Sequence, residues 1–205
     1  MLPAFTPVVK RHFITLTLFF SNVVLFNVMS LGVMSSRPLQ CATLERLTLD
    51  DMIAKSTAIV RGRVTDTWAA FSGSIIYTHY RVQVSETYKG AVQDSAEIVV
   101  TGGTVNGMRQ NFSGSPTLNP GDQFVFFLWT SKAGLTQIIG LTQGLFALPA
   151  DDGGSDPLAT RAPTRELVLD PVTARAVKDG PLSLRVSQLR SRIATVLTAN
   201  PGGKQ

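Results

Sequence analysis

The chain has 205 residues, of which 44% are hydrophobic and 16% are charged, and this composition predicts one main globular domain and excludes a largely disordered chain. The formal net charge is +5, but the 19 Lys and Arg residues are scattered, with no run longer than Lys10-Arg11, so the sequence disfavours a nucleic-acid patch. The single cysteine, Cys41, excludes an intrachain disulfide framework and a cysteine-based zinc site.

An uncharged, mainly apolar stretch runs from Phe13 to Met34, directly after the basic segment Lys10-Arg11-His12. This arrangement is typical of a secretory signal peptide. We therefore predict that residues 1–36 direct export, and that the rest of the chain is periplasmic, extracellular or anchored at the outer face of the inner membrane. The stretch also approaches the ~20 residues that span a bilayer. If residues 13–34 stay uncleaved, they form a membrane anchor.

The sequence Pro38-Leu39-Gln40-Cys41 suggests a lipoprotein in which Cys41 carries the lipid. Gln40, however, stands where a small residue is required. A free or buried thiol is the preferred interpretation of Cys41.

A helix is predicted to begin at Thr48 and to extend to about Ser56. Thr48 is a good N-cap, Asp51 lies three residues further on as in a capping box, and Leu47 and Met52 are placed for a hydrophobic staple. The neighbouring acids Asp50 and Asp51 point about 100° apart on a helix, which disfavours a paired-carboxylate site.

From Thr57 the hydrophobic period changes to two, which predicts β-strands. Gly62 interrupts the buried face of the first strand, and a glycine at such a position indicates a bulge, a bend or a close backbone approach. Both faces of QFVFFLWT are apolar, so this strand should be buried on both sides. The predicted strands cover residues 57–68, 75–90, 96–100 and 123–130, followed by 135–148 as one bent strand or two, with Gly140 and Gly144 as bend points. Short strands bounded by Gly and Pro predict a closed or sandwiched all-β domain over residues 43–150.

After this domain, the composition of residues 151–160 is typical of a flexible linker. Residues 161–199 are predicted to form a hairpin, with Asp170-Pro171 in its turn, and an amphipathic helix capped by Ser183. Docking of this helix on the barrel is preferred over binding to a membrane surface, because a membrane-surface helix needs a richer basic face. The apolar positions of the helix are Leu182, Val186, Leu189, Ile193 and Val196.

Catalytic groups are sparse in the exported part. His79 is its one histidine and is predicted to face solvent from the polar side of a strand. The chain contains no G-x-S-x-G elbow, and the glycines of residues 101–107 match neither a Walker loop nor a dinucleotide-binding loop. We expect no catalytic residue, no metal and no cofactor. The candidate binding residues are Arg61, Arg63, His79, Arg81 and Arg109, with the loops 70–75 and 102–121, because rigid scaffolds present binding residues on loops.

Residues 55–68, KSTAIVRGRVTDTW, and 75–90, IIYTHYRVQVSETYKG, resemble the opening strands of the netrin-like barrel of tissue inhibitors of metalloproteinases. The chain resembles still more closely exported bacterial proteins of uncharacterised function that share a later Pro-Gly-Asp turn and the ending found at residues 140–146. The resemblance covers about residues 47–148 and implies a small OB-like (netrin-like) barrel of five or six strands, with a short leading helix and a C-terminal hairpin and helix.

In those inhibitors a mature N-terminal Cys-x-Cys chelates the zinc of the protease. Here Cys41-Ala42-Thr43 keeps one of the two cysteines, so no inhibitory residue is transferred. The expected function is that of an exported, non-catalytic binding module whose partner is a protein or glycan of the envelope or extracellular space; export disfavours nucleic acid. The alternatives are a regulator or inhibitor of an extracellular protease and, ranked lower, a hydrolase that uses His79.

Overall fold

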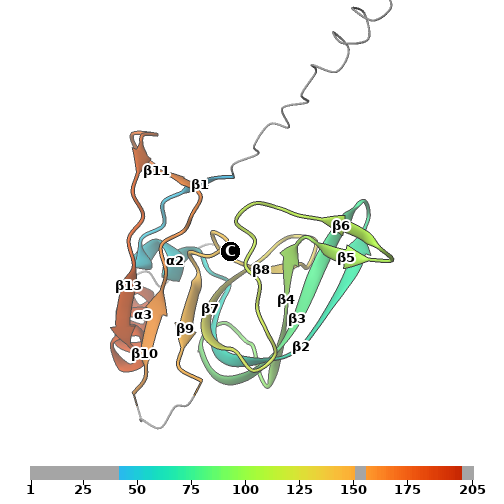
Figure 1. Cartoon of the computed structure of the whole chain (residues 1–205). Helices are drawn as coiled ribbons and strands as arrows, with labels where there is room; N and C mark the ends of the chain where they lie inside the picture. The colour runs from blue at the N-terminus through green and yellow to red at the C-terminus, as the bar shows by residue number, and fades with distance from the viewer. Residues whose placement is uncertain (1–41, 151–155, 200–205) are drawn as a thin grey trace, which may run out of the picture. The chain divides into compact units, whose positions relative to one another are not determined.

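The computed structural model describes residues 42–150 and 156–199, and these are mostly β (Figure 1). Residues 1–36, the predicted signal or anchor, and Cys41 lie outside the described residues. None of the helices in these two ranges has the length and hydropathy needed to cross a membrane. The helices are α2 (Leu49–Lys55) and α3 (Val186–Ala199).

Most of the strands belong to one sheet. Its members are β2 (Ala58–Ser72), β3 (Ile75–Lys89), β4 (Ser95–Thr101), β7 (Gln123–Thr130), β8 (Thr136–Ile138), β9 (Leu145–Leu148), β10 (Leu158–Arg161) and β13 (Leu182–Arg185). They are paired in the order β13-β10-β9-β7-β2-β3-β4, with β8 beside β7, and every pairing is antiparallel.

The sheet is open, whereas the sequence suggested a closed barrel. One edge of β7 is divided: Gln123–Phe126 pair with β9, and Leu128–Thr130 pair with β8. At the fork, Phe127 donates its N–H to Gly144 O and accepts from Ile139 N, both at 2.9 Å. β8 turns towards β4 and contacts it, but the described residues contain no ladder between the two strands. β9 turns the other way and continues the sheet to β10 and β13.

The turn between β8 and β9 confirms the predicted bend points. Gly140 has a φ of +60°. A Cβ on Gly144 would lie 2.7 Å from Ile139 O and 3.0 Å from Phe127 O. Only glycine fits this close to backbone oxygens. Residues 139–144 can therefore form a tight turn between β8 and β9. The region therefore contains two strands rather than one.

The β2–β3 hairpin is bulged, as Gly62 predicted. Its pairing register shifts at three places, one of them between Arg61 and Gly62. A Cβ on Gly62 would lie 2.5 Å from Val82 Cγ1 and 2.6 Å from Gln83 O. The glycine thus allows the two strands to approach closely where they bend.

The expected loop 70–75 is mostly strand. β2 continues to Ser72 and β3 begins at Ile75, so only Gly73 and Ser74 connect them. Gly73 has a φ of +61°, as the tight two-residue turns of hairpins require. Composition indicated a loop here, but cross-strand pairing extends the strands to the turn.

The sheet buries a separate hydrophobic core on each face. Successive residues of β7 point to opposite sides, and Val125, Phe126, Phe127 and Leu128 are all fully buried, which confirms the prediction of two-sided burial. The helix-side core, under α2 and α3, contains Met52, Ile53, Ile59, Val125, Phe127, Phe146, Leu148, Ala159, Val186, Leu189, Ile193 and Val196. The inner core, inside the curl of the sheet, contains Ala58, Val60, Val64, Tyr80, Val82, Ile98, Val100, Leu118, Phe126, Leu128 and Ile138.

The predicted capping box of α2 is present. Thr48 Oγ1 accepts from Asp51 N at 3.1 Å, and Asp51 Oδ2 accepts from Thr48 N at 3.0 Å. At the other end of the helix, Lys89 Nζ donates to Ile53 O and Ala54 O at 2.8 and 3.0 Å. A lysine of β3 therefore satisfies the final carbonyls of α2.

Helix α3 begins later than predicted, and Ser183 is not its cap. Ser183 lies in β13, opposite Thr160. The cap comes from a remote residue, because Asp156 Oδ1 accepts from Ser187 N at 2.8 Å. Gln188 Oε1 also accepts from Arg185 N at 2.9 Å. Four of the five predicted apolar positions are confirmed, since Val186, Leu189, Ile193 and Val196 are buried on α3. The fifth, Leu182, lies in β13, because this segment pairs with β10 before the helix begins.

Strand pairing joins residues 156–199 to residues 42–150. Residues 158–160, expected in a linker, lie in β10, because β13 and β9 pair with its two edges. The predicted hairpin is formed by β11 (Leu167–Leu169) and β12 (Ala176–Val177), which are antiparallel. β1 (Thr43–Glu45) pairs with β11 in parallel, so the start of the described chain is held beside its C-terminal part.

Candidate functional site

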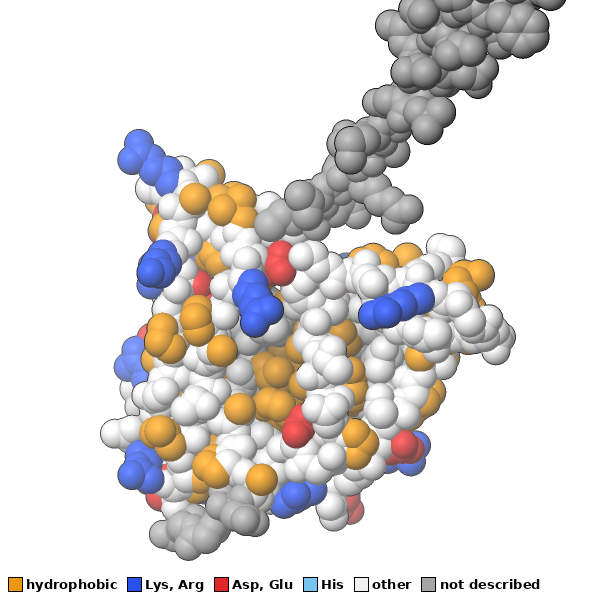
Figure 2. Space-filling view, viewed as in Figure 1, with side chains coloured by type: hydrophobic (Ala, Val, Ile, Leu, Met, Phe, Trp, Pro, Cys, Tyr) orange, Lys and Arg blue, Asp and Glu red, His pale blue; other side chains and the backbone are white. Residues whose placement is uncertain are grey.

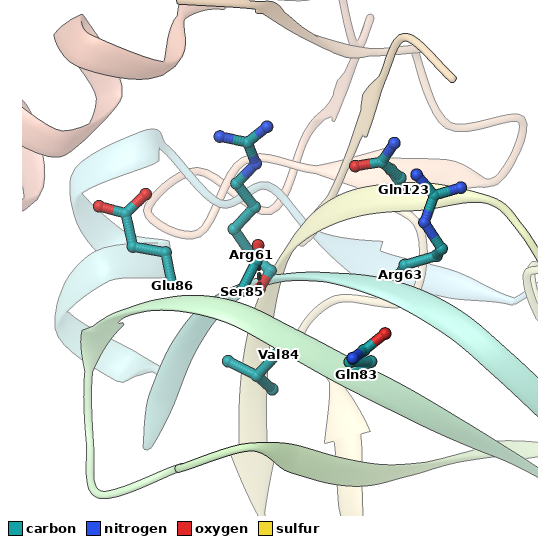
Figure 3. A pocket seen from close by; sticks show the side chains of 7 residues that line it. All are labelled: Arg61, Arg63, Gln83, Val84, Ser85, Glu86 and Gln123. Atoms are coloured by element: carbon teal, nitrogen blue, oxygen red, sulfur yellow. Dashed lines mark hydrogen bonds between the residues drawn. The ribbon is translucent and has the colours of Figure 1, made fainter. Parts of the chain in front are cut away.

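A shallow groove of about 480 Å³ lies on the face of the β2–β3 hairpin that carries Arg61 and Arg63. Figure 3 shows Arg61, Arg63, Glu86 and Gln123 projecting to one side of the strands, while Val84 points to the other. The lining residues are Arg61, Arg63, Gln83, Val84, Ser85, Glu86 and Gln123, which we call the arginine groove.

Strand alternation and register assemble the groove. Arg61 and Arg63 are two residues apart on β2 and continue the face that begins with Ile59 of the helix-side core. Arg63 lies between Gln83 of β3 and Gln123 of β7, its partners in the two ladders. Helix α3 covers the sheet at Ile59 and Val125, whereas Arg61 is half-buried and Arg63 is exposed.

The lining residues of the groove that the structure describes carry a net positive charge, from two arginines and one carboxylate, Glu86. Glu86 Oε1 lies 2.5 Å from Arg190 Nη2 of α3, and Glu86 Oε2 accepts from the Tyr88 hydroxyl at 2.8 Å. Burial and this hydrogen bond raise the pKa of Tyr88, so its proton is retained. Arg63 Nη1 donates to Gly121 O at 3.1 Å, which holds the guanidinium in place.

Contrary to the prediction, His79 does not face solvent. Its side chain is 17% exposed and stacks on Trp68, with ring centroids 5.2 Å apart and planes 14° apart. Its Nδ1 lies 2.7 Å from Glu97 Oε1. The indole covers the imidazole because Trp68 and His79 are cross-strand neighbours. Within the described part of the chain, no hydroxyl or thiol is hydrogen-bonded to this histidine.

The other basic candidates are dispersed. Arg81 lies on the face of Arg63 but further along the hairpin, with its guanidinium carbon 5.3 Å from the Trp68 ring centre and 3.8 Å between Nη1 and Asp66 Oδ2. Arg109 lies on β6 (Met108–Gln110), where its Nε donates to Asn111 Oδ1 at 3.1 Å. Figure 2 likewise shows the blue side chains of the visible face apart from one another.

The predicted loop 102–121 contains a small hairpin. β5 (Gly103–Val105) pairs with β6 around Asn106 and Gly107, whose φ values of +51° and +77° are typical of a type I′ turn. Gln110 connects this small hairpin to the tip of the β2–β3 hairpin. The Gln110 side chain accepts from Ile76 N at 2.7 Å and donates to Ser74 O at 2.8 Å. The segment is thus held against β3.

Sequence reasoning identified Arg61 and Arg63 but missed Gln83, Ser85 and Gln123. Neutral polar residues on a strand carry no signal of their own, and only the ladder register places Gln123 beside Arg63. In residues 42–150 and 156–199, no group of three His, Cys, Asp or Glu side chains is arranged to hold a metal. The groove presents charged and neutral hydrogen-bond donors, which suit a carboxylate or another oxyanion.

Comparison of the chain with protein-family models, with curated proteins and with solved structures found no match.

Proposed function

We propose that this protein is an exported, non-catalytic binding module of the cell envelope or extracellular space, and that its arginine groove binds an acidic, extended segment of a partner protein. One observation carries the proposal: Arg61 and Arg63 lie side by side on one face of β2, with Gln83 and Gln123 on both sides of Arg63. Planar guanidinium groups bind carboxylates through paired hydrogen bonds.

The spacing of the arginines favours a peptide as the ligand. Residues i and i+2 of a strand lie about 6.6 Å apart on the same face. An extended partner with acids at alternate positions presents carboxylates with the same period. Gln83 can bind a backbone carbonyl between those acids, and so can the second N–H of Gln123, whose Nε2 also donates to Ala150 O at 3.0 Å.

The scatter of basic side chains on the face seen in Figure 2 supports a small anionic ligand rather than nucleic acid, which requires a continuous basic surface. We also propose that the curl of β7, β2, β3 and β4 is a netrin-like barrel with one unpaired seam. The contact between β4 and β8 supports this proposal.

A binding assay with two peptides of equal charge tests this function. In the first, glutamates alternate with threonines; in the second, the same glutamates are adjacent, so that successive carboxylates point to opposite sides. We expect the full chain to bind the alternating peptide more tightly, as measured by fluorescence anisotropy. Arg63→Gln should weaken that binding by about tenfold, because a charged hydrogen bond is lost.

Arg109→Gln is the matched control, since it removes the same charge outside the groove and should leave the affinity unchanged. Equal binding of both peptides, or equal effects of the two substitutions, would show that only net charge attracts the peptide. Failure of the alternating peptide, together with Arg63-dependent binding of polyuronate, would replace the peptide with an acidic glycan.

A further inference from the structure

A second cavity, of about 540 Å³, lies between the inner face of the β2–β3–β4 part of the sheet and the segment 102–121. We call it the mouth pocket, because it lies at the open end of the curl that holds the inner core. Tyr80, Val100 and Leu118 of the inner core contribute to its lining. Its volume is within the range of small-molecule sites, and the ends of curled sheets are common places for such sites.

Tyr80 provides the first sign of a ligand. The residue is 3% exposed, and its hydroxyl oxygen accepts only a long hydrogen bond of 3.4 Å from Leu118 N. Among the described residues, no acceptor receives the hydroxyl proton of Tyr80. Buried tyrosine hydroxyls normally donate to a partner. The pocket therefore contains an unused donor at a buried position.

The polar lining residues of the mouth pocket, which form its rim, indicate which ligand it can bind. Hydroxyl and amide side chains such as Thr101, Ser115 and Asn119 both donate and accept, and none of the lining residues is acidic. Arg109 is the one charged lining residue, and it pairs with no carboxylate in the described ranges. Phe112, which is 41% exposed, adds a flat apolar surface.

The segment that forms the rim is held in place. Gly103 has a φ of +140°, and a Cβ at this position would lie 2.7 Å from Thr78 Oγ1. Thr78 Oγ1 donates to Gly102 O at 2.7 Å, and Thr101 and Ser115 are joined by their hydroxyls at 3.1 Å. A rim that is already ordered loses little conformational entropy when it binds a ligand.

We propose that the mouth pocket binds a small saccharide bearing one carboxylate, such as a uronic acid. The sugar hydroxyls match the mixed donors and acceptors of the rim, an acceptor oxygen of the sugar takes the Tyr80 proton, and its C–H face packs on Phe112. The carboxylate pairs with Arg109, which distinguishes a uronate from a neutral sugar. This site is separate from the arginine groove and does not depend on the function proposed for it.

Titration of the ¹⁵N-labelled full chain with D-glucuronate, followed by amide chemical shifts, tests the site. We expect shifts at residues 101–104 and 109–118 and none at residues 61–63. Arg109→Gln should weaken glucuronate binding by about tenfold, whereas Tyr80→Phe, which removes only the hydroxyl oxygen, should weaken it by about three- to tenfold. D-Glucose should bind at least tenfold more weakly than D-glucuronate.

Lys132→Gln, which removes a positive charge from an exposed residue that lines neither site, serves as the control and should leave glucuronate affinity unchanged. The proposal is overturned if tens of millimolar glucuronate shift no amide of the mouth pocket, if glucose binds equally well, or if neither Arg109→Gln nor Tyr80→Phe weakens binding. Loss of peptide binding at the arginine groove with retained glucuronate binding, or the reverse, would separate the two sites.

Discussion

Arg161 and Asp179 form an ion pair whose two side chains are each only 7% exposed. Arg161 Nη1 and Nη2 donate to the two carboxylate oxygens of Asp179 at 3.1 and 2.9 Å, and Nη2 also donates to Gly180 O. Thr164 N donates to the same carboxylate at 2.8 Å. The pair connects the end of β10 to the segment that leads into β13.

Replacing one member of this pair should be strongly destabilising. Arg161→Met leaves the Asp179 carboxylate buried without its counter-ion, and the loss of one partner of a buried pair costs about 3–5 kcal/mol. Urea unfolding monitored by circular dichroism measures the change in the free energy of unfolding. The double variant Arg161→Met/Asp179→Leu should be more stable than Arg161→Met alone.

The exposed pair Lys55–Glu45, with side chains 48% and 53% exposed, provides the control. Lys55→Met should change the free energy of unfolding by less than about 1 kcal/mol, because water already solvates both charges. Similar losses in Lys55→Met and Arg161→Met would show that burial does not determine the strength of the Arg161–Asp179 interaction.

The same carboxylate should make stability depend on pH. Burial alone would raise the pKa of Asp179, but hydrogen bonds from Thr164 N and Arg161 outweigh it and hold the pKa below its ordinary value of 3.8. The folded-state pKa is therefore the lower one, so the contribution is fully present above the unfolded-state value of about 3.9 and is lost as the pH falls towards the folded-state value.

The measurement is the difference in free energy of unfolding between the wild type and Asp179→Asn. We expect it to be constant from about pH 5 to 8 and to shrink below about pH 4. Other carboxylates with a lowered pKa, such as Asp51, are present in both proteins and cancel in the difference. A difference that grows on acidification would contradict this prediction.

Gly62→Ala should destabilise the long hairpin. The new Cβ would lie 2.5 Å from Val82 Cγ1 and 2.6 Å from Gln83 O, so the two strands would have to separate at the bulge. Such overpacking costs about 1–3 kcal/mol. Gly180→Ala is the matched control, because nothing lies within 4 Å of its Cβ position and its φ is ordinary. Thermal unfolding of both variants compares them, and equal melting temperatures would refute the close approach.

Asp156→Ala should loosen the first turn of α3. Asp156 accepts from Ser187 N and Ser187 Oγ at 2.8 and 2.7 Å, and these bonds also lower its pKa. Without the carboxylate, the Ser187 N–H in the first turn of α3 loses its partner. Hydrogen exchange should become faster at residues 186–188 while remaining unchanged in β3. Asp94→Ala is the control, since the Asp94 carboxylate accepts no hydrogen bond within the described residues.

Features that depend on neighbouring residues could be predicted from the sequence. Thr48 and Asp51 are three residues apart, and their capping box is the same in any fold that contains the helix. The apolar face of α3 follows from apolar residues three to four positions apart, and the two-sided burial of Phe126 and Phe127 follows from an apolar run that occupies both faces of the strand. The bulge at Gly62 is also local, because the missing Cβ permits it.

Features that depend on distant segments were decided by the tertiary structure. The division of the β7 edge at Phe127 opens the sheet. The register of β2 with β7 places Gln123 beside Arg63. The cap of α3 is Asp156 rather than Ser183. Hydrophobic periodicity defines which face of a strand is buried, but it contains no information about which strand lies next to it. The packing of the two cores determines which strands are neighbours. The same packing brings the polar groups of the candidate sites within reach of one another.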